Sequence, residues 1–96
     1  MLMQVYSLRD TKSEVYLLPM YAHNHGSAMR EIYAAVRGKY MKMVSEYPED
    51  FRLMHIGSFD DQAGLIDGLE PQFVSEVKTI IDAYNEEKQD EQPGLA

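Results

Sequence analysis

Residues 51–59 read FRLMHIGSF, and residues 60–64 read DDQAG. In an extended chain the apolar residues of the first segment fall on both sides, with Phe51, Leu53 and Phe59 on one and Met54 and Ile56 on the other. This pattern predicts a central strand that is covered on both faces. Gly57 within it indicates a bulge or the close approach of another backbone. Residues 60–64 have the length of a hairpin connection, so we expect residues 65–69 to return as a short fourth strand.

The chain before this strand begins with a predicted hairpin. Residues 3–8 and 14–22 are rich in apolar and tyrosine side chains, and polar turn residues separate them. Pro19 has no N–H for a sheet ladder. The second strand is therefore expected to lie at an edge, to bulge or to end at this proline.

A helix is predicted over residues 27–45, with Asn24 or Ser27 as its N-cap. Its apolar side chains recur at steps of three and four and form one stripe: Met29, Ile32, Tyr33, Val36, Tyr40 and Met43. Gly38 weakens the last turns by about 1 kcal/mol relative to alanine, and Pro48 ends the helix.

A second helix is expected to begin at Pro71, because proline is favoured in the first turn. Its packing stripe is Phe73, Val77, Ile80, Ile81 and Tyr84. The element order β-β-α-β-β-α predicts an α+β fold with a small, mainly antiparallel sheet and two packed helices. We expect one domain over residues 1–85 and an acidic, flexible C-terminal tail over residues 86–96.

Composition excludes several classes of protein. A chain of 96 residues makes one small domain. Because it has no cysteine, it has no disulfide scaffold, thiol nucleophile or Cys-based metal site. No apolar run approaches the roughly 20 residues that span a bilayer, and the N-terminus lacks signal-peptide features. We therefore expect a soluble intracellular protein with no membrane contact.

Charge is unevenly distributed along the chain. The formal net charge is −7, which argues against a polybasic protein that condenses nucleic acid. Residues 1–45 nevertheless carry six basic and three acidic groups, whereas residues 46–96 carry three basic and thirteen acidic groups. This division predicts either two faces of opposite sign or a solvated surface with an acidic tail.

The polar residues form no recognisable catalytic or metal-binding motif. His23 and His25 lie two residues apart, but no further ligands complete a metal site. His55 is expected to be a hydrogen-bonded sheet residue. Asp60 and Asp61 suit a turn and lack the remaining ligands of a calcium loop. We expect no cofactor, no metal and no enzymatic activity.

The tyrosines are more informative, because seven tyrosines and no tryptophan occur in the chain. Aromatic rings beside basic groups on a sheet stack single-stranded bases, although tyrosines also cover small sheets without any ligand. The candidate nucleic-acid-binding residues are Arg9, Lys12, Tyr16, Tyr21, Arg30 and Arg37. Their cations would offset phosphate charge and their rings would stack on bases.

Two stretches of the chain resemble a known family. Residues 16–21 read YLLPMY and precede NHGSAMR at 24–30, while residues 47–53 read YPEDFRL and precede IGSFDDQAG at 56–64. In this order they resemble the small nonstructural protein of microviruses, especially the gokushovirus group of single-stranded DNA phages. The resemblance covers residues 3–70. Family members often carry a doubled proline where Leu18 precedes Pro19 here.

The resemblance implies a protein of the infected bacterial cytoplasm that is not retained in the mature virion. It implies a role in viral genome replication or single-stranded DNA packaging, with direct DNA binding and no catalytic residue set. A module that binds a viral or host replication or packaging protein without DNA contact is the alternative. A small catalytic or metal-dependent domain around His23, His25 and Asp60 or Asp61 is a third class. The small core also predicts a homo-oligomer, most simply a dimer that buries sheet edges or Met-rich surface.

Overall fold

The computed structural model describes the backbone of residues 1–90 and the side chains of residues 1–87. The strands are β1 (Leu2–Asp10), β2 (Val15–Tyr16), β3 (Met20–Ala22), β4 (Phe51–Asp60) and β5 (Leu65–Glu76). The helices are α1 (His25–Arg37), α2 (Lys42–Glu46), a 3₁₀ turn η1 (Pro48–Asp50) and α3 (Val77–Asp90). The predicted α+β class and the order of its main elements are confirmed. No helix in the described residues is long and apolar enough to cross a membrane.

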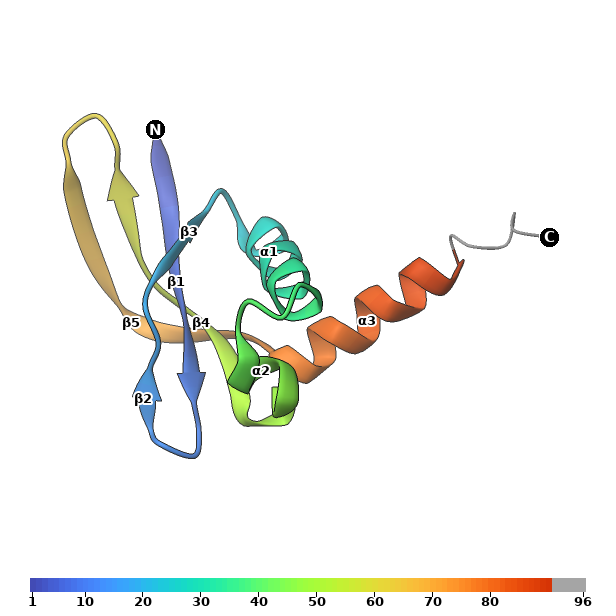
Figure 1. Ribbon diagram of the computed structural model, residues 1–96. Coiled ribbons are helices and arrows are strands. Elements are labelled where there is room, and N and C mark those ends of the chain that lie inside the picture. The colour runs from blue at the N-terminus through green and yellow to red at the C-terminus, as the bar shows by residue number, and fades with distance from the viewer. Residues whose placement is uncertain (91–96) are drawn as a thin grey trace.

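The five strands form one antiparallel sheet, with the order β2-β1-β4-β5 and with β3 also paired to β1. The predicted N-terminal hairpin is therefore present, and its second strand is interrupted at residues 17–19, around Pro19. The central position of β4 is confirmed. The helices lie on one side of the sheet (Figure 1), so the expectation that β4 is covered on both faces is wrong.

The hydrophobic core lies between the helices and one face of the sheet. Tyr6 and Leu8 of β1 and Leu53 of β4 point to this side, and each is at most 2% exposed. The core residues from the helices are Ala28, Ile32, Tyr33, Val44, Val77 and Ile80. Because side chains alternate along a strand, Met3, Val5, Ser7 and Arg9 point to the face that carries no helix.

The predicted first helix is shorter than its apolar stripe suggested. Asn24 caps α1 by accepting a hydrogen bond from the Ser27 N–H (2.8 Å), as one of the two expected caps. The helix ends at Arg37, because Gly38 and a left-handed Lys39 (φ 60°) break it before α2. Tyr40 and Met43 are 86% and 59% exposed, so their expected place in the packing stripe is wrong.

The second correction concerns Pro71, which lies inside strand β5 rather than at the start of a helix. β5 is an edge strand, where a missing N–H is tolerated. Residues 69–71 have no partner on β4 between the Gly57–Gly68 and His55–Gln72 pairs. The proline therefore lies in a bulge. As a result α3 begins at Val77, and Phe73 belongs to the sheet.

Gly57 marks both a bulge and a close backbone approach, as predicted. The register shifts on either side of Ile56, and a Cβ on Gly57 would lie 2.4 Å from the Asp67 carbonyl oxygen. The expected C-terminal tail (residues 86–96) overlaps the end of α3, which continues to Asp90. Residues 91–96 lie outside the described residues.

Candidate nucleic-acid interface

The face of the sheet without helices carries three of the six predicted nucleic-acid-binding residues. Directly paired residues of antiparallel strands point to the same face. Arg9 of β1 pairs with Tyr16 of β2, and Val5, two steps further on the same side of β1, pairs with Tyr21 of β3. We call this surface the open face, defined by Met3, Val5, Ser7 and Arg9, by the residues of β2, β3 and β4 paired with them, and by the β5 residues paired in turn with those of β4.

The other three predicted residues lie elsewhere. Lys12 is exposed in the turn between β1 and β2, and Arg30 and Arg37 lie on α1, on the helix side of the sheet. The Arg37 guanidinium lies over the Tyr33 ring at 5.6 Å and donates to the Tyr33 hydroxyl at 3.3 Å. The six residues therefore do not form one surface.

One row of the open face brings two arginines together. Arg9 pairs directly with Arg52 of β4, and Arg52 pairs in turn with Glu76 of β5. The Arg52 Nε lies 3.2 Å from a Glu76 carboxylate oxygen. The Arg9 Nε is buried and has no hydrogen-bond partner among the described residues. This row thus holds two cations for one carboxylate.

Each of these guanidinium groups lies against an aromatic ring. Arg9 lies over the Tyr16 ring and Arg52 over the Phe73 ring, both at 5.8 Å from the ring centroid. These cation–π contacts hold the two side chains along the sheet surface. Phe73 is 55% exposed and Tyr16 is 39% exposed, so the rings remain accessible beside the charges.

A second aromatic pair lies further along the open face. The rings of Tyr21 and Phe59 meet edge to face, with centroids 5.8 Å apart. They come from strands on either side of β1, so their contact covers the β1 residue between them, Val5, which is 4% exposed. Gly57, which pairs with Val5, adds no side chain there. The open face therefore presents four aromatic rings and two arginines.

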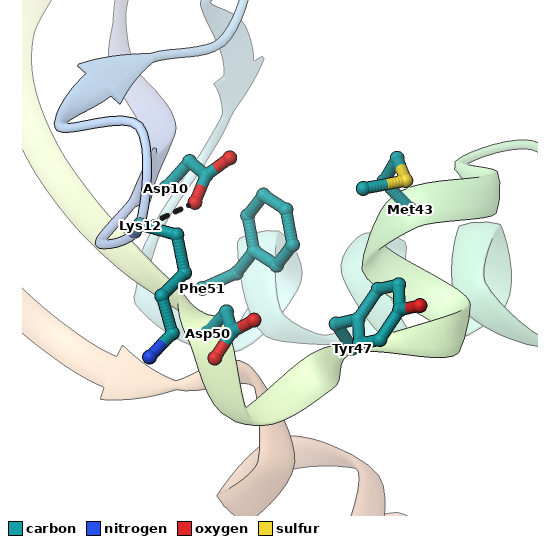
Figure 2. A pocket seen from close by; sticks show the side chains of 6 residues that line it. All are labelled: Asp10, Lys12, Met43, Tyr47, Asp50 and Phe51. Carbon is teal, nitrogen blue, oxygen red and sulfur yellow. Dashed lines mark hydrogen bonds between the residues drawn. The ribbon is translucent and has the colours of Figure 1, made fainter.

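A shallow pocket of about 260 Å³ lies on the helix side, between the β1–β2 turn and α2 (Figure 2). Its lining is Asp10, Lys12, Met43, Tyr47, Asp50 and Phe51. The Asp10 carboxylate accepts the Lys12 backbone N–H at 2.9 Å, which lowers the pKa of that carboxyl. Because the carboxylate is held by its own turn, we assign it a structural role.

Of the three histidines that the sequence singled out, His25 and His55 lie together beside Tyr6, with their ring centroids 5.3 Å apart. His55 bonds through Nε2 to the Gln4 side-chain oxygen (2.8 Å), which confirms it as a hydrogen-bonded sheet residue. His25 Nδ1 lies 2.7 Å from the hydroxyl of buried Tyr6, and burial raises the pKa of that phenol. In the part of the chain that the structure describes, no three His, Asp or Glu side chains are placed to hold a metal ion.

Comparison with known proteins identifies the family of this chain. A family model described as "Phage ORF5 protein" matches residues 3–80. The chain belongs to the phage ORF5 protein family. No significant match was found among curated proteins or among solved structures.

Membership of the ORF5 family makes this a bacteriophage protein, which agrees with the phage resemblance of the sequence at that level. The matched residues run from β1 to the first turn of α3 and include every residue of the open face described above. In this ORF5 protein the open face is thus part of the family domain.

Sequence reasoning missed three residues of this face. Arg52 lies in the acidic half of the chain, and Phe73 belongs to the helix that the sequence predicts from Pro71. The sequence predicts Phe59 on the same side as Phe51 and Leu53, whereas the bulge at Ile56 turns it to the open face. If the predicted fourth strand is extended to residue 76, Arg52 pairs with Glu76. This pair of opposite charges is the sequence signal that places Arg52 and its neighbours on the sheet.

Proposed function

We propose that this ORF5 protein binds single-stranded DNA on its open face and acts in microvirus genome replication or packaging without enzymatic activity. The paired arginines carry the proposal. Arg9 and Arg52 occupy directly opposite positions on neighbouring strands, where like charges destabilise a sheet. A phosphate group between them would relieve that repulsion, and Glu76 neutralises only one of the two.

The aromatic rings favour a single strand over a duplex. Phe73 and Tyr21 are 55% and 43% exposed, on the same face as the arginines. Unpaired bases stack on such rings for about 1–3 kcal/mol each, whereas the bases of a duplex are already stacked on one another. Rings beside cations on one sheet surface are an arrangement that serves single strands without sequence readout.

The net charge of −7 does not oppose this proposal. Of the paired strand residues that make up the open face, one carries a carboxylate, and that residue is Glu76. Carboxylates on other surfaces include Glu31 of α1 and Asp82 of α3. A local basic face on an acidic protein attracts a phosphate chain at short range, because salt screens charges beyond about 8–10 Å.

A protein-binding module is the second candidate function. The exposed side of α3 carries Asp82, Glu86 and Glu87, and Asp82 forms an ion pair with Lys78. An acidic helix of this kind suits a basic viral or host replication or packaging protein. With either function, we propose that the protein works in the cytoplasm of the infected bacterium and is not part of the mature virion.

The DNA affinities of two double variants distinguish the two functions. Both variants lose the same number of positive charges. Arg9→Gln/Arg52→Gln alters the open face, and Arg30→Gln/Arg37→Gln alters α1. We would measure fluorescence anisotropy of labelled oligothymidine over a series of salt concentrations. The open-face variant should lose about tenfold or more in affinity, and its salt slope should fall by about 1.4, or about 0.7 for each lost phosphate contact.

The α1 variant should bind like wild type. Binding that is absent at low salt would leave the protein-binding function. Equal losses in both variants would show that overall charge, rather than the open face, drives binding.

A further inference from the structure

The outer edge of the sheet is formed by β5, whose first four residues make a regular ladder with β4. Leu65, Ile66, Asp67 and Gly68 pair in sequence with Asp60, Phe59, Ser58 and Gly57. All four residues of β5 are exposed, including Leu65 at 61% and Ile66 at 64%. Every second residue of such a strand turns its N–H and C=O groups away from the sheet. This segment is therefore an unpaired edge with apolar side chains.

Both faces of this segment are open to solvent. Ile66 lies on the open face, in the row of Phe59, while Leu65 lies on the opposite face in the row of Leu2. Leu2 is 56% exposed, so the helices do not cover this end of the sheet. The β4–β5 hairpin indeed extends beyond the helices (Figure 1).

The remainder of β5 is protected against strand addition, but this segment is not. Residues 69–71 bulge and include Pro71, and a second irregularity follows near Val74. Bulges and proline are common devices that prevent pairing at an edge. Residues 65–68 have neither, and their one charged side chain is Asp67.

We propose that residues 64–68 pair antiparallel with the same segment of a second copy, across a twofold axis at Ile66. Antiparallel pairing of identical strands requires a twofold axis perpendicular to the sheet, with one residue opposite itself. With Ile66 on the axis, Leu65 lies opposite Asp67 of the second copy and Gly64 opposite its Gly68. The two sheets then form one continuous sheet.

Charge disfavours one of the two neighbouring registers. Placing Asp67 on the axis would set two carboxylates directly opposite, which is unfavourable. The two aspartates of the hairpin turn already have partners. Asp61 lies 2.8 Å from the N-terminal ammonium, and Asp60 accepts the Gln62 and Ala63 N–H groups. The hydrogen bond from the Ala63 amide, and to a smaller extent that from the Gln62 amide, lowers the pKa of the Asp60 carboxyl.

The symmetry also determines where the two open faces lie. A twofold axis perpendicular to the sheet keeps both open faces on the same side. Ile66 and Phe59 of each copy would meet at the centre of the enlarged surface, flanked by the two sets of arginines. A dimer of this kind would offer one strand of DNA a surface of twice the length.

The test does not involve DNA, so it is independent of the proposed function. The chain contains no cysteine, so Ile66→Cys carries the only thiol. Directly opposed Cα atoms of antiparallel strands lie about 4.5–5.5 Å apart, within the range that a disulfide bridges. Under mild oxidation this variant should form a covalent dimer much faster than Leu18→Cys, whose position is 90% exposed but not on β5. Equal or slower cross-linking of Ile66→Cys would overturn the proposal.

Sedimentation measures the same interface without a cross-link. Wild type should sediment as a dimer, Ile66→Lys as a folded monomer by circular dichroism, and Leu18→Lys as a dimer. Added salt should strengthen the dimer by screening its acidic chains, whereas it weakens DNA binding. A monomeric wild type, or a dimer that survives Ile66→Lys, would contradict the proposed edge.

Discussion

Arg9 of β1 lies directly opposite Arg52 of β4, and each guanidinium lies 5.8 Å from the centroid of an aromatic ring on the adjacent outer strand. The rings are Tyr16 and Phe73. Two like charges at one register position lower the stability of a sheet unless a counter-charge is present. The described chain supplies one, Glu76, to Arg52. The pair is therefore the observation that most specifically supports the proposal that the open face binds an anion.

Removing the internal counter-charge should improve DNA binding. In Glu76→Gln, Arg52 loses its carboxylate partner at 3.2 Å and is free to bind phosphate. Exposed ion pairs contribute up to about 1 kcal/mol, so we expect affinity to rise by up to about fivefold. Asp82→Asn is the matched control, because it breaks the Lys78 ion pair with the same change in net charge. Anisotropy titrations that show the same gain for both variants would refute the role of Glu76.

Removing one ring of the open face should weaken binding without changing its salt dependence. Phe73→Ala takes away a ring that is 55% exposed, and the loss of a stacked base costs about 1–3 kcal/mol. Tyr40→Ala removes a ring that is 86% exposed on the helix side, and it should bind like wild type. The same anisotropy titrations over a salt series measure both effects. Unchanged affinity in Phe73→Ala would argue against base stacking at this position.

Two paired glycines should respond differently to an added methyl group. Gly57→Ala would place its Cβ 2.4 Å from the Asp67 carbonyl oxygen, whereas a Cβ on Gly68 would meet no atom within 4 Å. Urea unfolding should show a loss of about 1–3 kcal/mol for Gly57→Ala. Gly68→Ala, which lies opposite on β5, should stay within about 0.5 kcal/mol of wild type. Similar free energies of unfolding for Gly57→Ala and Gly68→Ala would show that β4 and β5 can move apart at Gly57 with little loss of stability.

The two hairpin turns have the same geometry but different residues at their last position. In the first turn the Asp10 carbonyl accepts a hydrogen bond from the Glu14 N–H, and in the second the Asp60 carbonyl accepts one from the Gly64 N–H. Both distances are 2.8 Å. Both residues are left-handed, with φ of 64° and 71°. Glu14→Gly should therefore raise the free energy of unfolding by about 0.5–1 kcal/mol, because a side chain is disfavoured there. Glu14→Gln keeps the side chain and should leave the stability unchanged, and a gain in this control would point to charge instead.

The sequence predicted what depends on local pattern. The apolar residues on both sides of residues 51–59 and the spacing from Met29 to Val36 predicted β4 and α1, and Asn24 was one of two caps expected from residue type. The prediction that a helix begins at Pro71 is wrong because proline suits both a helix start and an edge-strand bulge. Only the pairing of β5 with β4 distinguishes the two, and that pairing is a long-range property.

The candidate site was predicted in part for the same reason. Arg9, Tyr16 and Tyr21 share a face because the N-terminal hairpin is local in sequence. Arg52 and Phe73 join them through contacts between residues far apart in the chain. Arg30 and Arg37 fitted the charge pattern, but the packing of α1 against the core places them on the other side of the sheet.

The most direct test of the open face is an NMR titration of the isotopically labelled protein with oligothymidine. It reports which backbone amides respond, without any substitution. We predict shifts that centre on Arg9, Tyr21, Arg52 and Phe73, while the amides of Arg30 and Arg37 stay unchanged. Shifts that centre on α1 or α3, or no shifts at low salt, would contradict DNA binding on the open face.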